Sequence, residues 1–357
     1  MYKIERISLK DHFAAEEALI ERQRKHLEKR KQFVFKIDEI DKEYRKEILA
    51  LIGEEKVKKA LPRHKKLLGE LERPILFDAS SEGLKKEEEF RQRIITERHE
   101  LYRSLRYDHE KAIKIRQEYL KETISATEQY LDIGEKPEYV SKNIEKVPKT
   151  DNPWSHYVPP YSDEWGTSGS GSTRGTCWGS HSENRWTGAI NCWSYNRVVG
   201  ADDSDNGWTT AMSEVWVWFS MPAAGLVEVV AVLQDTDTNL NGRLRDESGC
   251  SDGNVRQLDR AYLWTSGGTE RYQLIRDHSV RSDGGDRSWN IPLTSPGDFI
   301  YPHIFSSESY TQGQSVLVAI GVQDDTSFRV NDMSVDPSRV TSRYFVKDIY
   351  VRSTGAP

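Results

Sequence analysis

The sharpest pattern for chemistry in the sequence is an acidic, Asn-rich stretch that offers side-chain oxygens at every second position. These residues are Asp235, Asp237, Asn239 and Asn241. Calcium binds several oxygen ligands from one turn of chain, and the spacing, followed by Gly242, matches the first half of a D-x-[DN]-x-[DN]-G calcium loop. The match is partial, because Ser248 stands at the twelfth position, where a bidentate glutamate is expected. Calcium is therefore the candidate cofactor, and a polar hairpin turn at Asn241-Gly242 is the competing interpretation.

A second acidic pair, Asp324 and Asp325, follows an apolar run in the way that Asp235 does. If both runs are strands that point the same way, the two acidic segments meet at one end of a sheet and form a site for a cation or a polar ligand. Acidic turns are also common on surfaces, so the competing interpretation is two unrelated, solvated loops. The topology decides between the two.

Trp216 and Trp218 are the aromatic candidates for ligand binding, because their two-residue spacing places both on one face of an expected strand. An exposed pair of this kind stacks on sugar rings, whereas a buried pair fills the core of a sandwich. Burial is the commoner use of such large side chains. The exposure of the two rings therefore decides whether they form a binding platform.

No catalytic signature is present in the sequence. It contains no G-x-S-x-G, phosphate-binding loop, dinucleotide fingerprint or H-E-x-x-H motif. Pairs of Asp and Glu are abundant, which leaves a glycoside-acting enzyme as a lesser alternative, since the separation of two carboxylates is invisible in a sequence. We therefore expect a protein that is not an enzyme.

The charge distribution divides the chain into two parts. Residues 1–149 carry 35 Lys and Arg against 31 Asp and Glu, and residues 150–357 carry 16 against 26 together with all ten Trp. A nucleic-acid interface needs clustered Lys and Arg, so the acidic second part excludes nucleic acid as a partner. The mixed charges of the first part are typical of solvated helix faces.

Within the first part, residues 1–135 are expected to form two long helices. Residues 11–60 are rich in Glu, Lys, Arg, Leu and Ile, and an apolar stripe of three- and four-residue steps runs from Phe33 to Leu51. Residues 62–72 suit a short helix, and residues 84–131 suit a second long one. The simplest arrangement is an antiparallel, coiled-coil-like hairpin that forms a stalk. Its narrow stripes predict a homo-oligomer, because other copies of the chain would bury them.

Residues 136–175 are expected to form a linker and an extended arm, because they are rich in Pro, Gly and Ser. Residues 176–357 alternate between apolar and polar positions and predict an antiparallel β-sandwich of the jelly-roll type. The candidate strands are Ala189–Val199, Ser213–Phe219, Leu226–Leu233, Arg256–Thr265, Arg271–Arg276, Ser315–Val322 and Arg343–Arg352. The stretch from Glu214 to Gly242 is interpreted as the central hairpin of this domain. The fold class is thus α+β with several domains.

The three cysteines are Cys177, Cys192 and Cys250. An odd and small number does not make a disulfide framework, and no C-x-x-C suggests zinc. Cys177 and Cys192 each precede a Trp, and they would face one another if they lay across a hairpin. Two buried, free thiols are the alternative, and cytoplasmic synthesis favours it.

The segment MYKIERISLKDHF lacks the apolar core of a secretory signal, and no apolar run approaches about 18 residues, so neither a signal peptide nor a transmembrane segment is expected. We expect synthesis in the cytoplasm, followed by release or by incorporation into a particle if the protein works outside the cell. The leading interpretation is a structural or attachment protein with a self-assembling helical part and an outward β-sandwich. The alternative is a module that binds a glycan or a receptor on a cell surface. Such a module would belong to a secreted toxin, and its binding would depend on calcium.

Overall fold

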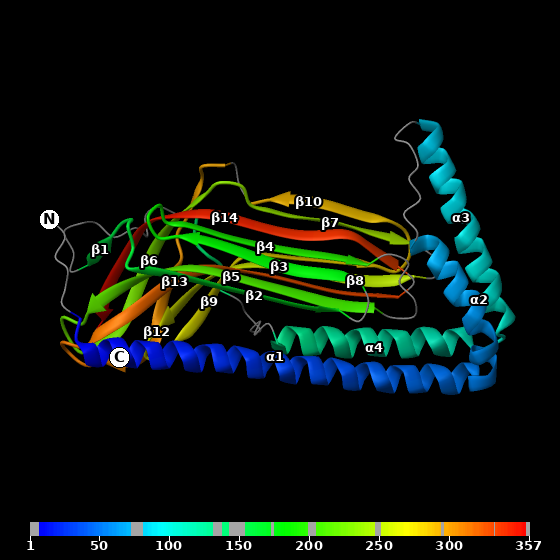
Figure 1. The fold of residues 1–357 in the computed structure, drawn as a ribbon, viewed down its shortest axis with the longest axis horizontal. Coiled ribbons are helices and arrows are strands. Elements are labelled where there is room, and N and C mark those ends of the chain that lie inside the picture. The colour runs from blue at the N-terminus through cyan, green and yellow to red at the C-terminus, as the bar shows by residue number, and fades with distance from the viewer. Residues whose placement is uncertain are drawn as a thin grey trace.

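The computed structural model describes residues 7–72, 81–130, 138–142, 154–172, 175–198, 205–246, 251–293, 296–331 and 333–354. In these ranges, helices pack along one side of a two-sheet β-sandwich (Figure 1). The helices are α1 (Leu9–Ile52), α2 (Glu54–Glu72), α3 (Ser81–Ser104) and α4 (His109–Tyr130). Within the described part of the chain, no helix has the length and apolarity that a membrane crossing requires.

The helices form the predicted antiparallel hairpin, but the hairpin is bent. The ring of Phe33 in α1 stacks on that of Tyr130 in α4 at 4.3 Å, and the ring of Tyr44 stacks on that of Tyr119 at 4.1 Å, so the two helices run in opposite directions. Helix α1 ends at Gly53, whose φ of 94° favours glycine. Beyond this bend α2 pairs with α3, and residues 105–108 separate α3 from α4. Each predicted long helix is therefore two helices.

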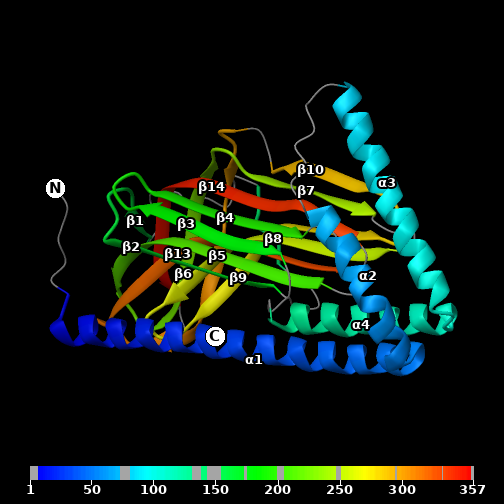
Figure 2. The same ribbon diagram turned by 45° about the vertical axis from the view of Figure 1, so that its right-hand side comes forward.

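The hairpin does not stand away from the sandwich as a stalk. Helix α1 lies along the whole sandwich, and only α2 and α3 project from its end (Figures 1 and 2). The apolar stripe from Phe33 to Ile48 is buried against α4 and the sandwich residue Trp208. One chain therefore buries this stripe by itself and does not need other copies of the chain to cover it.

The sandwich consists of a five-stranded and a nine-stranded sheet. The five-stranded sheet has the order β2-β5-β13-β8-β9, with β2 (Asp163–Ser172), β5 (Asp205–Ser220), β13 (Ser315–Asn331), β8 (Asp252–Thr265) and β9 (Glu270–Ser282). The nine-stranded sheet contains β1 (Ser155–Tyr157), β3 (Thr176–Asn184), β4 (Ala189–Val198), β6 (Gly225–Asp235), β7 (Asn239–Asp246), β10 (Arg287–Pro292), β11 (Phe299–Ile300), β12 (His303–Tyr310) and β14 (Met333–Thr354). All pairings between these strands are antiparallel, which confirms the predicted sandwich.

The main core lies between the two sheets. It is built from alternating residues of β5, β6, β13 and β14, for example Val217, Val229, Val318 and Val346. On the other face of β6, Val230 and Val232 form a second cluster. This strand is therefore buried on both faces, as its nearly continuous apolar sequence predicts.

Two expectations about the strands are wrong. The stretch from Glu214 to Gly242 is not a hairpin, because β5 belongs to the five-stranded sheet and β6 to the nine-stranded sheet. The connection around Met221 crosses from one sheet to the other. A hairpin and a crossover give the same alternation of apolar and polar residues within each strand, so the sequence pattern does not distinguish them. The glycine-rich segment 166–175, expected as a flexible linker, contains most of strand β2, which pairs with β5. Of the predicted linker, residues 136–137, 143–153 and 173–174 lie outside the described residues.

Candidate functional site

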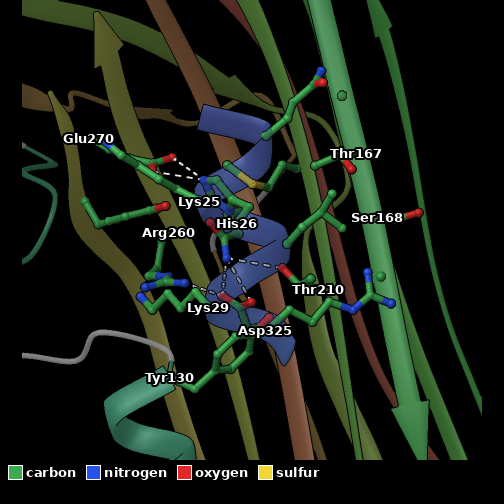
Figure 3. A pocket seen from close by; sticks show the side chains of 18 of the residues that line it. Lys25, His26, Lys29, Tyr130, Thr167, Ser168, Thr210, Arg260, Glu270 and Asp325 are labelled. Carbon is green, nitrogen blue, oxygen red and sulfur yellow. Dashed lines mark hydrogen bonds and ion pairs between the residues drawn. The ribbon is translucent and has the colours of Figure 1, made fainter. Parts of the chain in front are cut away.

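A cavity of about 510 Å³ lies between α1 and the outer face of the five-stranded sheet (Figure 3). Helix α1 contributes the basic side chains Lys25, His26, Lys29 and Arg30. Strand β2 contributes Trp165 and the small residues that follow it, and β5, β8, β9 and β13 contribute mainly polar and aromatic ones. Its volume lies in the range of roughly 300–1,000 Å³ that ligand pockets occupy. The site is therefore formed by the two parts of the chain together.

Arg22 fixes α1 on the sheet at one end of the cavity. Its Nη1 atom donates to both carboxylate oxygens of Glu214, at 2.9 and 3.0 Å, and its Nη2 atom donates to Glu270 at 3.1 Å. The guanidinium also lies 4.9 Å from the ring centroid of Trp165 and 5.0 Å from that of Trp264. Arg22 and Glu214 are both buried, so their charges are satisfied by one another and not by water.

Glu270 and His26 form an ion-pair geometry at the cavity wall (Figure 3). The Nε2 atom of His26 lies 3.0 Å from Oε2 of Glu270. Burial alone would raise the pKa of Glu270, but the hydrogen bond from His26 and the charge of Arg22 outweigh it and lower this pKa to about 2. Glu270 is therefore a carboxylate over the whole neutral range.

A polar network forms the cavity floor. Arg260 Nη2 donates to Asp325 Oδ2 at 2.6 Å, and Gln323 Nε2 donates to Asp325 Oδ1 at 2.9 Å and to Thr210 Oγ1 at 3.2 Å. A carboxylate only accepts hydrogen bonds, so the amide nitrogen of Gln323 must face Asp325. The amide oxygen of Gln323 is buried and accepts no hydrogen bond from any residue that the structure describes. It is a buried acceptor that the described residues leave without a donor.

Tyr130 of α4 closes the lower side of the cavity (Figure 3). Burial, with the nearby charge of Asp325, raises the pKa of its hydroxyl to about 12. The hydroxyl is therefore protonated at neutral pH. Together with Trp165 and Tyr272, Tyr130 gives the cavity aromatic walls beside its polar floor.

The predicted aromatic platform of Trp216 and Trp218 is not exposed. Trp216 is 8% exposed, packs in a cluster with Ala15 of α1, and donates its indole N–H to Glu214 at 2.6 Å. Trp218 is half-buried in the same cluster, with His12 of α1 at 5.8 Å between ring centroids. The two rings do share one face of β5, but α1 covers that face.

Asp324 and Asp325 are not in a loop, because both lie within strand β13 and are fully buried. Successive residues of a strand point to opposite faces. Asp325 faces the cavity, whereas Asp324 accepts a hydrogen bond from Ser342 Oγ at 2.5 Å in the interior of the sandwich. Burial and the neighbouring carboxylate of Asp259 raise the pKa of Asp324 well above its usual value. Only Asp325 belongs to the candidate site.

The stretch predicted to bind calcium does not form a hairpin turn at Asn241-Gly242, because both residues lie in strand β7. Strands β6 and β7 both pair with β14: Asp235 lies opposite Tyr344, and Asn239 lies opposite Thr341. The chain therefore runs on along β14 from β6 to β7, and residues 236–238 are a short interruption between the two strands. Gly242 lies in mid-strand, where a Cβ atom would come within 2.3 Å of the Trp289 ring.

The predicted calcium ligands have other partners. The carboxylate of Asp235 accepts from Thr238 at 2.9 Å, and that of Asp237 pairs with Arg343 at 3.0 Å. Asn239 donates to the side-chain oxygen of Asn290 at 2.6 Å, and Asn241 lies in β7. In the described ranges, no three His, Cys, Asp or Glu residues come together in a group that could hold a metal ion. Calcium binding itself stays a prediction.

Cys177 and Cys192 do not face one another. In the pairing of β3 with β4, Cys177 is opposite Asn196 and Cys192 is opposite His181. Both thiols are free, and they belong to different apolar clusters. Cys250 lies outside the described residues.

Most residues of the cavity were not predicted from the sequence. Arg22, His26 and Arg30 follow one another at four-residue steps, and this row continues toward the buried Phe33 and Ile37. When charged side chains continue the buried apolar stripe of a helix, the surface on which the helix packs is expected to carry charged or polar side chains at that point. This signal could have found the α1 side of the cavity, but the sheet residues opposite it carry no comparable spacing.

Comparison with known proteins gives the chain no family. No family model and no curated protein matches it. Solved structures similar to it include a family 35 carbohydrate-binding module from Clostridium thermocellum, with 8% identity and a TM-score of 0.18 over 56% of this chain and 99% of that chain. They also include the TmCBM61 module in complex with beta-1,4-galactotriose (14% identity, TM-score 0.16, 49% and 88% covered) and a xylan-binding domain of family 22 (12%, 0.14, 60% and 97%). TM-scores this low support no conclusion about function, which the side chains of the cavity must supply.

Proposed function

We propose that the protein is a non-enzymatic glycan-binding module and that the cavity beneath α1 receives the sugar. The observation that carries the proposal is the buried amide oxygen of Gln323, which has no donor among the described residues and belongs to a residue that lines a cavity of about 510 Å³. A buried acceptor without a partner is costly, so a ligand hydroxyl that donates to it is favoured.

The remaining lining of the cavity has the composition that a sugar requires. Trp165, Tyr130 and Tyr272 offer apolar ring surface for sugar C–H groups, and Thr167, Thr210 and the floor network offer donors and acceptors for hydroxyls. A polyhydroxylated ligand uses both kinds of surface, whereas a purely apolar ligand would leave the polar floor unsatisfied.

The test is a glycan array with the wild-type protein, followed by calorimetric titration of the glycans that bind. Gln323→Met removes the free acceptor at similar volume and is expected to weaken binding about 10-fold. Thr210→Val is a second, nearly isosteric change in the same network and is expected to act in the same direction. Gln312→Met is the matched control, because Gln312 is exposed in a loop and donates only to Pro222 O.

Two results would contradict the proposal. Either no glycan binds the wild-type protein, or glycans bind and both cavity variants bind them as tightly as the wild type does. Melting temperatures of all variants separate loss of binding from loss of folding.

A self-assembling structural or attachment protein is the second candidate, and the outer face of α1 favours it. Phe13, Ile20 and Leu27 recur every seven residues there and are 56–66% exposed. Seven-residue spacing is typical of helices that pair with helices, so a second copy of the chain would bury this row. Light scattering tests it: Ile20→Glu should convert an oligomer into a monomer, and a wild-type protein that is monomeric at all concentrations excludes it.

A further inference from the structure

We propose that the cavity selects acidic glycans and that Arg30 binds their carboxylate or sulfate group. This inference rests on the proposed glycan binding and adds the chemical class of the ligand. It follows from the partners of the charged side chains at the cavity: some arginines pair with carboxylates there, and Arg30 does not.

Two buried arginines, Arg22 beside the cavity and Arg260 in its lining, are already ion-paired. Arg22 binds Glu214 and Glu270, at 2.9 and 3.1 Å, and Arg260 binds Asp325 at 2.6 Å. Among the residues that the structure describes, these ion pairs engage both carboxylates that line the cavity, Glu270 and Asp325. Each of these two carboxylates therefore already pairs with an arginine other than Arg30.

Arg30 is a cation of the cavity wall that has no carboxylate partner among the described residues. Its guanidinium makes one hydrogen bond, from Nη2 to the backbone oxygen of Ser170 at a long 3.4 Å, and no carboxylate in the described ranges pairs with it. It is half-buried at the cavity wall, so water screens its charge less than it screens a fully exposed one. An anion brought to this point gains an interaction that the protein itself does not supply.

The guanidinium of Arg30 is also held in position. It lies 4.8 Å from the ring centroid of Trp208, and on strand β2 a Cβ atom at Gly169 would come within 2.6 Å of its Nη1 atom. The bare backbone at Gly169 thus gives the space that the guanidinium occupies. A planar guanidinium fixed in this way suits bidentate binding of a carboxylate or a sulfate.

Lys25, an exposed lysine at the rim of the same cavity, adds a second positive charge. The acceptor of Gln323 and the cation of Arg30 therefore lie in one cavity, so a single ligand with both a hydroxyl and an acid group satisfies both. A neutral sugar satisfies only the first.

The experiment compares glycans in matched pairs that differ only in one acid group, such as neutral oligosaccharides and their C6-oxidised or O-sulfated forms. For the wild-type protein we expect the acidic member of at least one pair to bind about 10- to 100-fold more tightly, because hydrogen bonds to charged groups are the stronger ones. Uronic and sulfated arms distinguish carboxylate from sulfate as the preferred group.

Arg30→Gln is expected to remove this preference while leaving the binding of the neutral member within about 3-fold, because the floor network is unchanged. Arg30→Lys keeps the charge but loses the planar fork, and an intermediate preference is expected. Arg24→Gln is the control: it makes the same charge change on the same helix at an exposed position outside the cavity.

The outcomes separate the two proposals. If acidic and neutral members bind wild type equally, or if Arg30→Gln keeps the preference, the inference is overturned and glycan binding stands. If no member of any pair binds, glycan binding fails and the inference fails with it. A preference that Arg24→Gln reduces as much as Arg30→Gln does would show a general effect of charge and would also overturn the assignment of Arg30.

Discussion

Arg22 and Glu214, 192 residues apart in the sequence, form a buried ion pair that joins the helical part of the chain to the sandwich. Glu214 also accepts hydrogen bonds from Trp216 Nε1 and from the hydroxyl of Tyr262, each at 2.6 Å. Three donors from α1, β5 and β8 thus converge on one carboxylate. The position of α1, and with it the shape of the cavity, depends on this pair.

Arg22→Met is expected to lower the free energy of unfolding by about 3–5 kcal/mol, because it leaves the charge of Glu214 buried and uncompensated. Adding Glu214→Gln should recover part of this loss, since the double variant no longer buries a charge there. Urea unfolding measures both. Arg24→Met, at an exposed position of the same helix, should change stability by less than about 0.5 kcal/mol. A loss below about 1 kcal/mol for Arg22→Met would mean that α1 is held mainly by its other contacts, which include the Asp41–Arg329 ion pair.

Stability should depend on pH through Glu270. Its pKa in the folded protein is about 2, below the value of about 4.3 for an unfolded glutamate, so the unfolded chain binds more protons as the pH falls. The stabilisation is therefore complete above about pH 5 and is lost toward pH 2. The wild type should be more stable than Glu270→Gln at pH 7, and the difference should shrink between pH 5 and pH 3.

Urea unfolding at several pH values measures that difference. Glu308, whose pKa is also lowered to about 2 by hydrogen bonds from Thr269 and Tyr310 that outweigh burial, titrates in the same window in both proteins. The comparison with Glu270→Gln therefore isolates Glu270. A difference that stays constant from pH 7 to pH 3 would contradict the ion-pair geometry.

The two described thiols should be unreactive in the folded protein. Burial raises the pKa of Cys177 to about 11 and that of Cys192 well above its usual value, so neither forms the reactive thiolate at pH 8. In a Cys250→Ser background, Ellman's reagent should detect almost no thiol in the native protein and two thiols in guanidinium. No thiol after unfolding would instead mean that Cys177 and Cys192 are joined in a disulfide.

Much of the fold could be predicted from the sequence, because each element has a local signature. The stripe from Phe33 to Leu51 predicted a helix and its buried face, and alternation predicted strands in β4, β6, β8 and β14. Strand β2 was missed because its glycines lower strand propensity. They are explained by neighbours distant in sequence: a Cβ atom at Gly171 would come within 2.8 Å of the Trp208 indole nitrogen.

The candidate site was much harder to predict, because it depends on how the two parts of the chain pack. Trp216 and Asp325 lie on the same outer face of the five-stranded sheet, yet one is covered by α1 and the other lines the cavity. Nothing local to either residue distinguishes the two environments. The acidic pair in β13 illustrates the same limit, since adjacent aspartates point into opposite sides of one sheet.

We expect the stretch around Asp237 not to bind calcium, so that calcium leaves the melting temperature of the protein unchanged. A calcium site needs several oxygen ligands that are free to turn toward one point. Here the carboxylate of Asp237 pairs with Arg343, and Asn239 and Asn241 are fixed in strand β7, which pairs with β10. Melting temperatures of the wild type with millimolar calcium and with a chelator should therefore agree. A rise with calcium that disappears in Asp237→Ala, but persists in the exposed control Asp283→Ala, would show that the ion pair opens and that the stretch does bind calcium.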